Sequence, residues 1–188
     1  NHITDFIEKP KTFVSDLAII GIYYFKDGAY LRKELEYLVE NNLKEKGEYQ
    51  ITNAMENMKL KGTKFYPGEV AEWLDCGNKN ATVYTNQRVL EFIKATPLVD
   101  ESAQIIDSVI IQPSFVGKNV VIEKSVIGPH ASIGANSKIS NCVIGNSMIQ
   151  ENASVSNKVI KNSMIGNFVT YEGNADDVSI GDYCEYKS

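Results

Sequence analysis

The chain has 188 residues, of which 43% are hydrophobic and 23% charged, as is typical of a globular protein rather than a disordered one. Acidic residues outnumber basic ones by 24 to 19, and only two arginines are present, which argues against a duplex-binding module. No apolar run approaches the roughly 18 residues of a membrane helix. The three widely spaced cysteines indicate neither a disulfide framework nor a structural zinc site. We therefore expect a soluble, cytoplasmic protein without nucleic-acid or membrane partners.

Strand and helix patterns alternate over residues 1–96. Residues 17–25 form an apolar run bounded by polar residues, which predicts a strand buried on both faces. Helical spacing follows from Leu31 to Val39 and again from Ile51 to about Lys59, and a third helix is expected over residues 81–93. A short strand is predicted at Phe65 and Tyr66. This alternation favours an α/β segment.

After Pro97 the helical period gives way to a short repeat. Aliphatic residues recur every five or six positions, and asparagine repeatedly stands three residues before the next aliphatic. The aliphatic positions are Val116, Ile122, Ile127, Ile133, Ile139, Ile144, Ile149, Val155, Ile160 and Ile165. The asparagines are Asn119, Asn136, Asn141, Asn146, Asn152, Asn157 and Asn162. Because asparagine tolerates the left-handed backbone conformation, this pattern predicts a regular turn and a parallel β-solenoid with three strands per coil over residues 97–188.

Stretches such as Ile127–Gly134 resemble the hexapeptide repeats of left-handed β-helix proteins, which implies a left-handed parallel β-helix. Proteins of this fold include carbonic anhydrases, acyltransferases and oligomerisation or regulatory domains. A carbonic anhydrase needs three zinc-binding histidines, but this chain has only His2 and His130. His130 is the one candidate for the general base of an acyltransferase. It also stands at the position that asparagine takes in the other turns, and a turn residue explains it without chemistry.

Four motifs in the first segment resemble, in order, the second half of a sugar-phosphate nucleotidyltransferase domain of the type that makes dTDP-glucose or UDP-glucose. They are Glu8-Lys9-Pro10, Gly21-Ile22-Tyr23-Tyr24-Phe25, Gly47-Glu48-Tyr49-Gln50-Ile51-Thr52-Asn53 and Trp73-Leu74-Asp75-Cys76-Gly77. Asn53 and Cys76 replace the aspartate and threonine that are usual in the family. A hexapeptide prism behind this domain is also an arrangement of the family.

The resemblance implies a role for residues of each motif. Asp75 would provide a carboxylate for a magnesium ion, although an aspartate before Gly77 is also a common turn residue. Lys9 would contact the sugar phosphate and Glu8 the sugar hydroxyls, although without the resemblance a solvated surface pair is equally common. Gly21 would let the sugar approach the backbone, and Tyr23 would pack or form a hydrogen bond nearby. Without the resemblance, Tyr23 is interpreted as a residue of a strand core. Lys46 would lie near the phosphates. We expect Mg²⁺ as the cofactor of the intact enzyme.

The other half of such a domain is not recognisable in the chain. The family's Gly-x-Gly-Thr-Arg loop cannot be present, because no two glycines are two positions apart. We therefore expect a fragment that lacks roughly one domain, about 150 residues. The complete enzyme would join a hexose-1-phosphate to a nucleoside triphosphate, and the fragment alone would be inactive.

A second hypothesis from the sequence is an oligomerisation or regulatory module. Apolar residues stand just before several inward aliphatics and predict one outer stripe through which the β-helix forms a homo-oligomer. This stripe consists of Val126, Val143, Met148, Val159 and Met164.

Overall fold

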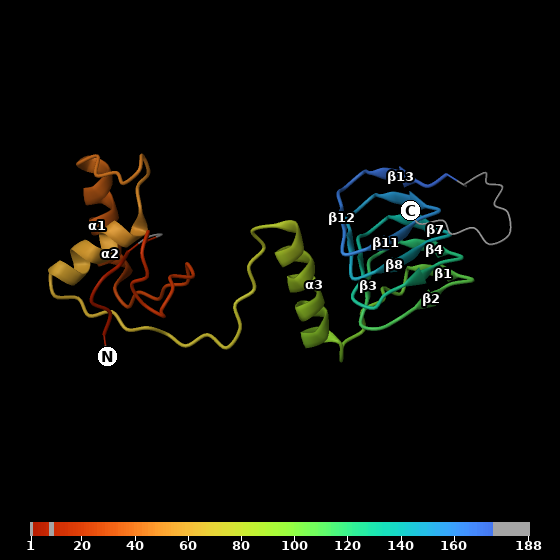
Figure 1. Ribbon diagram of the computed structural model, residues 1–188, viewed down its shortest axis with the longest axis horizontal. Coiled ribbons are helices and arrows are strands. Elements are labelled where there is room, and N and C mark those ends of the chain that lie inside the picture. The colour runs from red at the N-terminus through yellow and green to blue at the C-terminus, as the bar shows by residue number, and fades with distance from the viewer. Residues whose placement is uncertain (1, 8–9, 175–188) are drawn as a thin grey trace, which may run out of the picture. The chain divides into compact units, whose positions relative to one another are not determined.

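Figure 1 shows the computed structural model of the chain, which describes residues 2–7 and 10–174. The chain divides into two compact units, Asn1–Trp73 and Leu74–Ser188. The third helix belongs to the second unit, so this division falls earlier than the predicted one after residue 96. The limits of the family domain at residues 1–96 stay a prediction.

The first unit is built around two helices, α1 (Gly28–Glu40) and α2 (Ile51–Leu60), both as predicted. The Asp27 side chain accepts a hydrogen bond from the Tyr30 N–H at 2.9 Å and caps the start of α1. Leu38 of α1 and Met55 and Met58 of α2 form the buried core of the unit.

The predicted strand at residues 17–25 is not formed. No strand pairs with this segment in the part of the chain that the structure describes, and the Ile22 and Tyr24 side chains are 72% and 91% exposed. The physical reason is that a strand is stable only when a neighbour satisfies its backbone hydrogen bonds and covers its apolar faces. The short strand predicted at Phe65 and Tyr66 is wrong as well, although the Phe65 carbonyl accepts a hydrogen bond from the Ile3 N–H at 2.8 Å.

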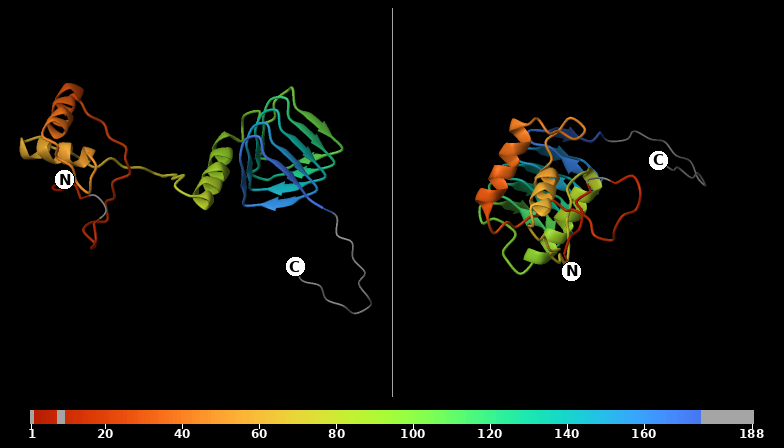
Figure 2. Two further views of the ribbon diagram at one scale, coloured as in Figure 1. Left: turned by 90° about the horizontal axis from the view of Figure 1, so that it is seen from above. Right: turned by 90° about the vertical axis from the view of Figure 1, so that its left-hand side faces the viewer.

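The second unit consists of α3 (Lys79–Ile93) and a solenoid of short parallel strands (Figures 1 and 2). The strands are β1 (Gln104–Ile106), β2 (Val109–Ile110), β3 (Phe115–Val116), β4 (Val121–Glu123), β5 (Val126–Ile127), β6 (Ser132–Ile133), β7 (Lys138–Ser140), β8 (Val143–Gly145), β9 (Met148–Ile149), β10 (Ser154–Ser156), β11 (Val159–Lys161), β12 (Met164–Ile165) and β13 (Thr170–Glu172).

Three parallel sheets form the three faces of the solenoid, in the orders β1-β4-β7-β10-β13, β2-β5-β8-β11 and β3-β6-β9-β12. Each inward aliphatic pairs with the equivalent residue of the next coil, as in Ile122 with Ile139 and Ile127 with Ile144. The repeat aliphatics from Val116 to Ile160 are at most 6% exposed and form one continuous core. The parallel β-helix is therefore confirmed, and its geometry fits the left-handed form that the repeats resemble.

The corners of the β-helix confirm the predicted turns. All seven repeat asparagines have positive φ angles, between 42° and 59°, and His130 has the same conformation at φ 61°. Asparagine side chains also bond from coil to coil. The Nδ2 of Asn141 donates to Oδ1 of Asn157 at 3.2 Å, and that of Asn146 to Asn162 at 2.7 Å. The corners are thus fixed by backbone conformation and by side-chain ladders.

The single outer apolar stripe predicted from the sequence is wrong, because its residues lie on two faces. Val126, Val143 and Val159 stack in register with Val109 on the face of β2, β5, β8 and β11, which we call the valine face. Met148 and Met164 pair with each other on the face of β3, β6, β9 and β12. Val143 and Met148 are five residues apart and belong to successive strands of one coil, whereas Val126 and Val143 are 17 residues apart and lie on the same face in neighbouring coils.

None of the helices described in the structure is both long enough and apolar enough to cross a membrane.

Candidate functional site

The loop that carries Asp75 is held by the first turns of α3. An Asp75 side-chain oxygen, Oδ1, accepts a hydrogen bond from the Gly77 N–H at 3.2 Å, which closes a small turn. The Asp75 carbonyl accepts a bond from Oγ1 of Thr85, and the Cys76 carbonyl one from Oγ1 of Thr82, both at 3.2 Å. The Asp75 carboxylate itself is exposed and can receive a ligand. Both interpretations of Asp75 therefore fit its geometry, because a turn residue can also present a carboxylate to a metal.

α3 begins directly after this loop and lies along the face of β3, β6, β9 and β12, as two directions of view show (Figures 1 and 2). Val83 and Leu90, about two turns apart, are 3% and 2% exposed. Asn86 lies between them and makes two contacts with the β-helix. Its Oδ1 accepts a bond from Oγ of Ser132 at 2.6 Å, and its Nδ2 donates to the His130 carbonyl at 3.1 Å. The apolar and polar contacts together attach α3 to this face.

His130 joins the same attachment through its side chain. Its Nε2 lies 2.7 Å from Oε1 of Glu91 on α3, and the His130 side chain is 16% exposed. The hydrogen bond with His130, followed by that with Lys94, lowers the pKa of Glu91 below its usual value. The left-handed corner conformation supports the turn interpretation of this histidine. Its role as a base in acyl transfer stays a prediction.

The site residues predicted in the first unit occupy loops. Gly21 has φ 78°, a conformation that favours glycine, and nothing lies within 4 Å of the position that a Cβ would take. Lys46 and Gly47 form the tip of a tight turn, at φ 51° and 86°, closed by backbone bonds between Glu45 and Glu48. The Tyr23 ring lies 6.3 Å from that of Phe25. Glu8 and Lys9 lie outside the described residues. Open space beside Gly21 is what the approach of a sugar to the backbone requires.

The predicted site residues are divided between the two units. Gly21, Tyr23 and Lys46 belong to the first unit and Asp75 to the second. Within the described part of the chain, no three His, Cys, Asp or Glu side chains are grouped as metal ligands. One exposed carboxylate fits Mg²⁺, which commonly binds through one or two carboxylates together with substrate phosphates and water. Asp75 could provide that carboxylate, with phosphate oxygens completing the shell.

Sequence reasoning missed the residues that connect the β-helix to the Asp75 loop. At 3.6 residues per turn, Asn86 and Glu91 flank the buried Val83 and Leu90 of α3 on opposite sides. Polar residues at this helical spacing among apolar ones are the signal that could have indicated a docked helix. Their partners Ser132 and His130 could not be inferred, because they follow about 40 residues later in the chain.

The comparisons with known proteins agree with the family that the four sequence motifs of the first segment resemble. Residues 1–91 match the family model described as Nucleotidyl transferase. A glucose-1-phosphate thymidylyltransferase of Streptomyces antibioticus is 28% identical over 148 residues, which are 71% of this chain and 40% of that protein. A glucose-1-phosphate adenylyltransferase of Lachnospira eligens is 30% identical over 152 residues, 80% of this chain and 34% of that protein. The bifunctional protein GlmU of Clostridioides difficile is 28% identical over 184 residues, 89% of this chain and 39% of that protein.

The chain therefore spans 34% to 40% of the length of these relatives. Among solved structures, serine acetyltransferase isoform 3 of Entamoeba histolytica in complex with cysteine is a distant match. It has 13% identity and a TM-score of 0.36 over 82% of this chain and 60% of that one, and it supports no assignment. On its motifs and these relatives, residues 1–91 of the chain match the nucleotidyl transferase family, and a parallel β-helix follows them.

Proposed function

We propose that this chain is part of an enzyme that makes a nucleoside-diphosphate hexose, dTDP-glucose or UDP-glucose, from a nucleoside triphosphate and a hexose-1-phosphate. The match of residues 1–91 to the nucleotidyl transferase family carries the proposal. The relatives named above include a thymidylyltransferase and an adenylyltransferase of glucose-1-phosphate. The substrate assays therefore include ATP beside dTTP and UTP.

The proposed chemistry is attack of a sugar-phosphate oxygen on the α-phosphorus, with pyrophosphate as the leaving group. Both reactants are polyanions, so charge neutralisation and alignment are the main requirements. A bound Mg²⁺ would neutralise the phosphates, and Asp75 would hold it. Lys9 and Lys46 would add positive charge, Glu8 would bind sugar hydroxyls, and Gly21 would let the sugar lie close to the backbone.

The 188 residues alone should not turn over substrate, because the sequence has no glycine-rich loop of the form that holds the triphosphate. The activity therefore belongs to a protein that also supplies this loop. We further propose a cytoplasmic location, in accord with the unpaired thiols of Cys76 and Cys142.

The test is the Asp75→Asn variant in an enzyme that joins this chain to the missing part of the domain, taken from its own gene. Pyrophosphate release should fall by orders of magnitude, because the neutral amide is a poor Mg²⁺ ligand. Asp27→Asn is the matched control, since Asp27 is also a carboxylate that accepts a backbone N–H, and asparagine caps a helix equally well. Near wild-type rates in Asp75→Asn would exclude the metal role.

A second candidate function is assembly or regulation through the β-helix, and the valine face favours it. Val109, Val143 and Val159 are 56%, 47% and 83% exposed, and they stack in one column with Val126. An exposed apolar column of this kind marks a contact surface. A homo-oligomer formed through this face is compatible with the enzymatic function.

Acyl transfer by His130 is the remaining candidate. The contact of its Nε2 with Glu91 and its place under α3 favour the structural role. Assaying acyl transfer from acetyl-CoA in the wild type and in His130→Ala tests it, and an activity that the substitution abolishes would support catalysis.

A further inference from the structure

A continuous set of contacts runs from the β-helix through α3 to Asp75. We infer that Ser132 and His130 of the β-helix, with Asn86 and Glu91 of α3, are positioning residues that fix the loop of the metal-binding carboxylate. The inference rests on the proposed function for the role of Asp75. It gives the β-helix a part in catalysis that requires no active site of its own.

The β-helix end of these contacts is rigid. The His130 N–H donates to the Pro113 carbonyl at 2.7 Å, and the Ser132 N–H to the Ser147 carbonyl at 2.9 Å. Ile133, the next residue, is fully buried in the core. The two groups that receive α3 are therefore held by the coils on either side.

The contacts of α3 are distributed along the helix. Near its start, Lys79 Nζ donates to the Asn162 carbonyl at 2.8 Å. Asn86 bonds to Ser132 and to the His130 carbonyl, and Glu91 contacts the His130 ring. Lys79 and Glu91 are about 18 Å apart along the helix axis, at 1.5 Å per residue. Contacts at both ends and in the middle restrict the rotation and the tilt of the helix.

The same helix holds the Asp75 loop. Thr85, next to Asn86, donates its hydroxyl to the Asp75 carbonyl, and Thr82 donates to the Cys76 carbonyl. Asn78 caps α3 by accepting the Ala81 N–H at 3.0 Å. Asp75 is thus connected to the β-helix through two adjacent residues of α3: Thr85 bonds to the Asp75 carbonyl, and Asn86 bonds to the β-helix.

The consequence for catalysis follows from the geometry of phosphoryl transfer. Displacing a catalytic group by about 1 Å can reduce the rate by about a hundredfold. Without the hydrogen bonds from α3, the short loop that precedes this helix would not hold the Asp75 carboxylate to within about 1 Å. A helix fixed on a rigid β-helix provides this anchor.

The first experiment measures the mobility of the loop by a nitroxide spin label on Cys76, which is exposed and adjacent to Asp75. Cys184 is replaced by serine, and Cys142 is buried. His130→Asn removes the ring but keeps the corner, because asparagine occupies the equivalent corners. Glu91→Ala removes the other partner, and Glu91→Gln keeps an oxygen that can accept a hydrogen bond from the ring.

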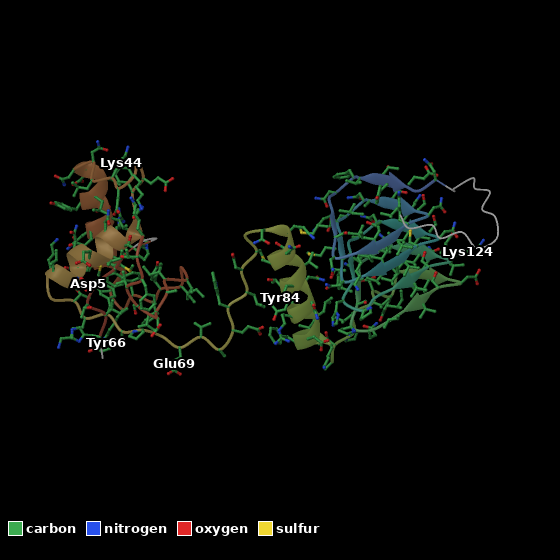
Figure 3. The ribbon with its side chains drawn as sticks, in the orientation of Figure 1. Asp5, Lys44, Tyr66, Glu69, Tyr84 and Lys124 are labelled. Atoms are coloured by element: carbon green, nitrogen blue, oxygen red, sulfur yellow. The ribbon has the colours of Figure 1, made fainter. Side chains whose placement is uncertain are left out.

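We expect the label to become more mobile in His130→Asn and Glu91→Ala and to return toward the wild-type spectrum in Glu91→Gln. Lys124→Asn is the matched control. It places asparagine at another left-handed corner, with φ 47°, on the side of the β-helix away from α3 (Figure 3). Unchanged spectra in both loosening variants, or an equal change in Lys124→Asn, would overturn the inference.

The second experiment uses the complete enzyme. His130→Asn and Glu91→Ala should raise the Mg²⁺ concentration for half-maximal activity several-fold, and Glu91→Gln should largely restore it. If the label on Cys76 becomes more mobile but the Mg²⁺ concentration for half-maximal activity stays unchanged, the positioning role is overturned. Because the label needs no turnover, failure of the proposed function, seen as an active Asp75→Asn enzyme, remains distinguishable from failure of the contacts.

Discussion

At the scale of single residues, the corners of the β-helix show how one side chain serves two purposes. An L-residue in the left-handed conformation costs roughly 1–2 kcal/mol, and asparagine lowers this cost through local polar contacts. Asn141 and Asn146 also donate to the asparagine one coil further on. The residue that permits the turn therefore also joins neighbouring coils.

Two alanine substitutions should separate these purposes. Asn152→Ala, at φ 58°, should destabilise the β-helix by about 1 kcal/mol, because it removes the residue type that tolerates the corner. Asn141→Ala should cost about 2 kcal/mol, since it also removes the bond to Asn157. Denaturant unfolding measures both. Equal losses would contradict a contribution from the ladder.

The two described cysteines should react at very different rates. Cys142 is 2% exposed, its Sγ lies 3.1 Å from the Ser140 carbonyl, and burial raises the pKa of its thiol. The nucleophilic thiolate is thus disfavoured and shielded. In a Cys184→Ser background, alkylation followed by mass spectrometry should modify Cys76 in the native protein and Cys142 only after unfolding. Fast native modification of Cys142 would show that the coil opens locally.

At the scale of elements, α3 depends on a pair that changes with pH. The groups that face Glu91 are His130 of the β-helix and Lys94 of its own helix, and both lower the pKa of its carboxyl. A group with a lowered folded pKa contributes stability above its unfolded pKa and loses it as the pH falls through the folded value. The contribution of Glu91 to the attachment of α3 should therefore be complete above pH 4.5, the usual pKa of a glutamate carboxyl, and weaken as the pH falls below it.

Hydrogen exchange, corrected for the intrinsic pH dependence, measures this effect. Protection of α3 should decrease as the pH falls below 4.5, while the core strands β4 to β9 remain protected. Glu91→Gln removes the titrating group and should make the protection of α3 insensitive to pH in this range. The same loss of protection in Glu91→Gln would assign the effect to another group.

The elements also show what the sequence can predict. The inward aliphatics and most corners of the β-helix were predictable, because each coil repeats one local rule: an inward aliphatic at Ile127 or Ile144 and a left-handed corner three residues before it. The helices α1 to α3 followed from local spacing. The strand at residues 17–25 failed because its stability requires neighbours, which no local pattern supplies.

Within the candidate site, the motif around Asp75 was recognisable, but its attachment was not. The bonds from Thr82 and Thr85 are local to α3 and need only the helix to form. The contacts of Asn86 and Glu91 with Ser132 and His130 depend on the face against which α3 packs. That choice is made by tertiary packing, and the sequence contains no spacing that specifies it.

At the scale of the whole molecule, the two units differ in the size of their cores. The β-helix buries a continuous column of aliphatic residues, whereas the first unit buries few large side chains and exposes Phe13, Leu17 and Ile22. Calorimetry should therefore show two transitions, with that of the first unit at the lower temperature. Met55→Ala should lower only the first and Ile133→Ala only the second, each by about 2–5 kcal/mol of stability. One transition that both variants shift would contradict independent units.

The last prediction concerns assembly through the valine face. This face is four strands tall, and strands lie about 4.8 Å apart, so it offers less than the roughly 800 Å² per partner of a standard interface. We therefore expect association in the micromolar range or weaker, detected by sedimentation equilibrium up to high micromolar concentration. Val143→Lys should abolish it, because a charge in the middle of the column would have to be buried without a partner. Val39→Lys is the control, since Val39 on α1 is 56% exposed and lies outside the column, and this variant should associate like the wild type. A wild-type protein that stays monomeric throughout, or a Val143→Lys variant that associates normally, would exclude the valine face as the contact surface and leave its exposure without a role in assembly.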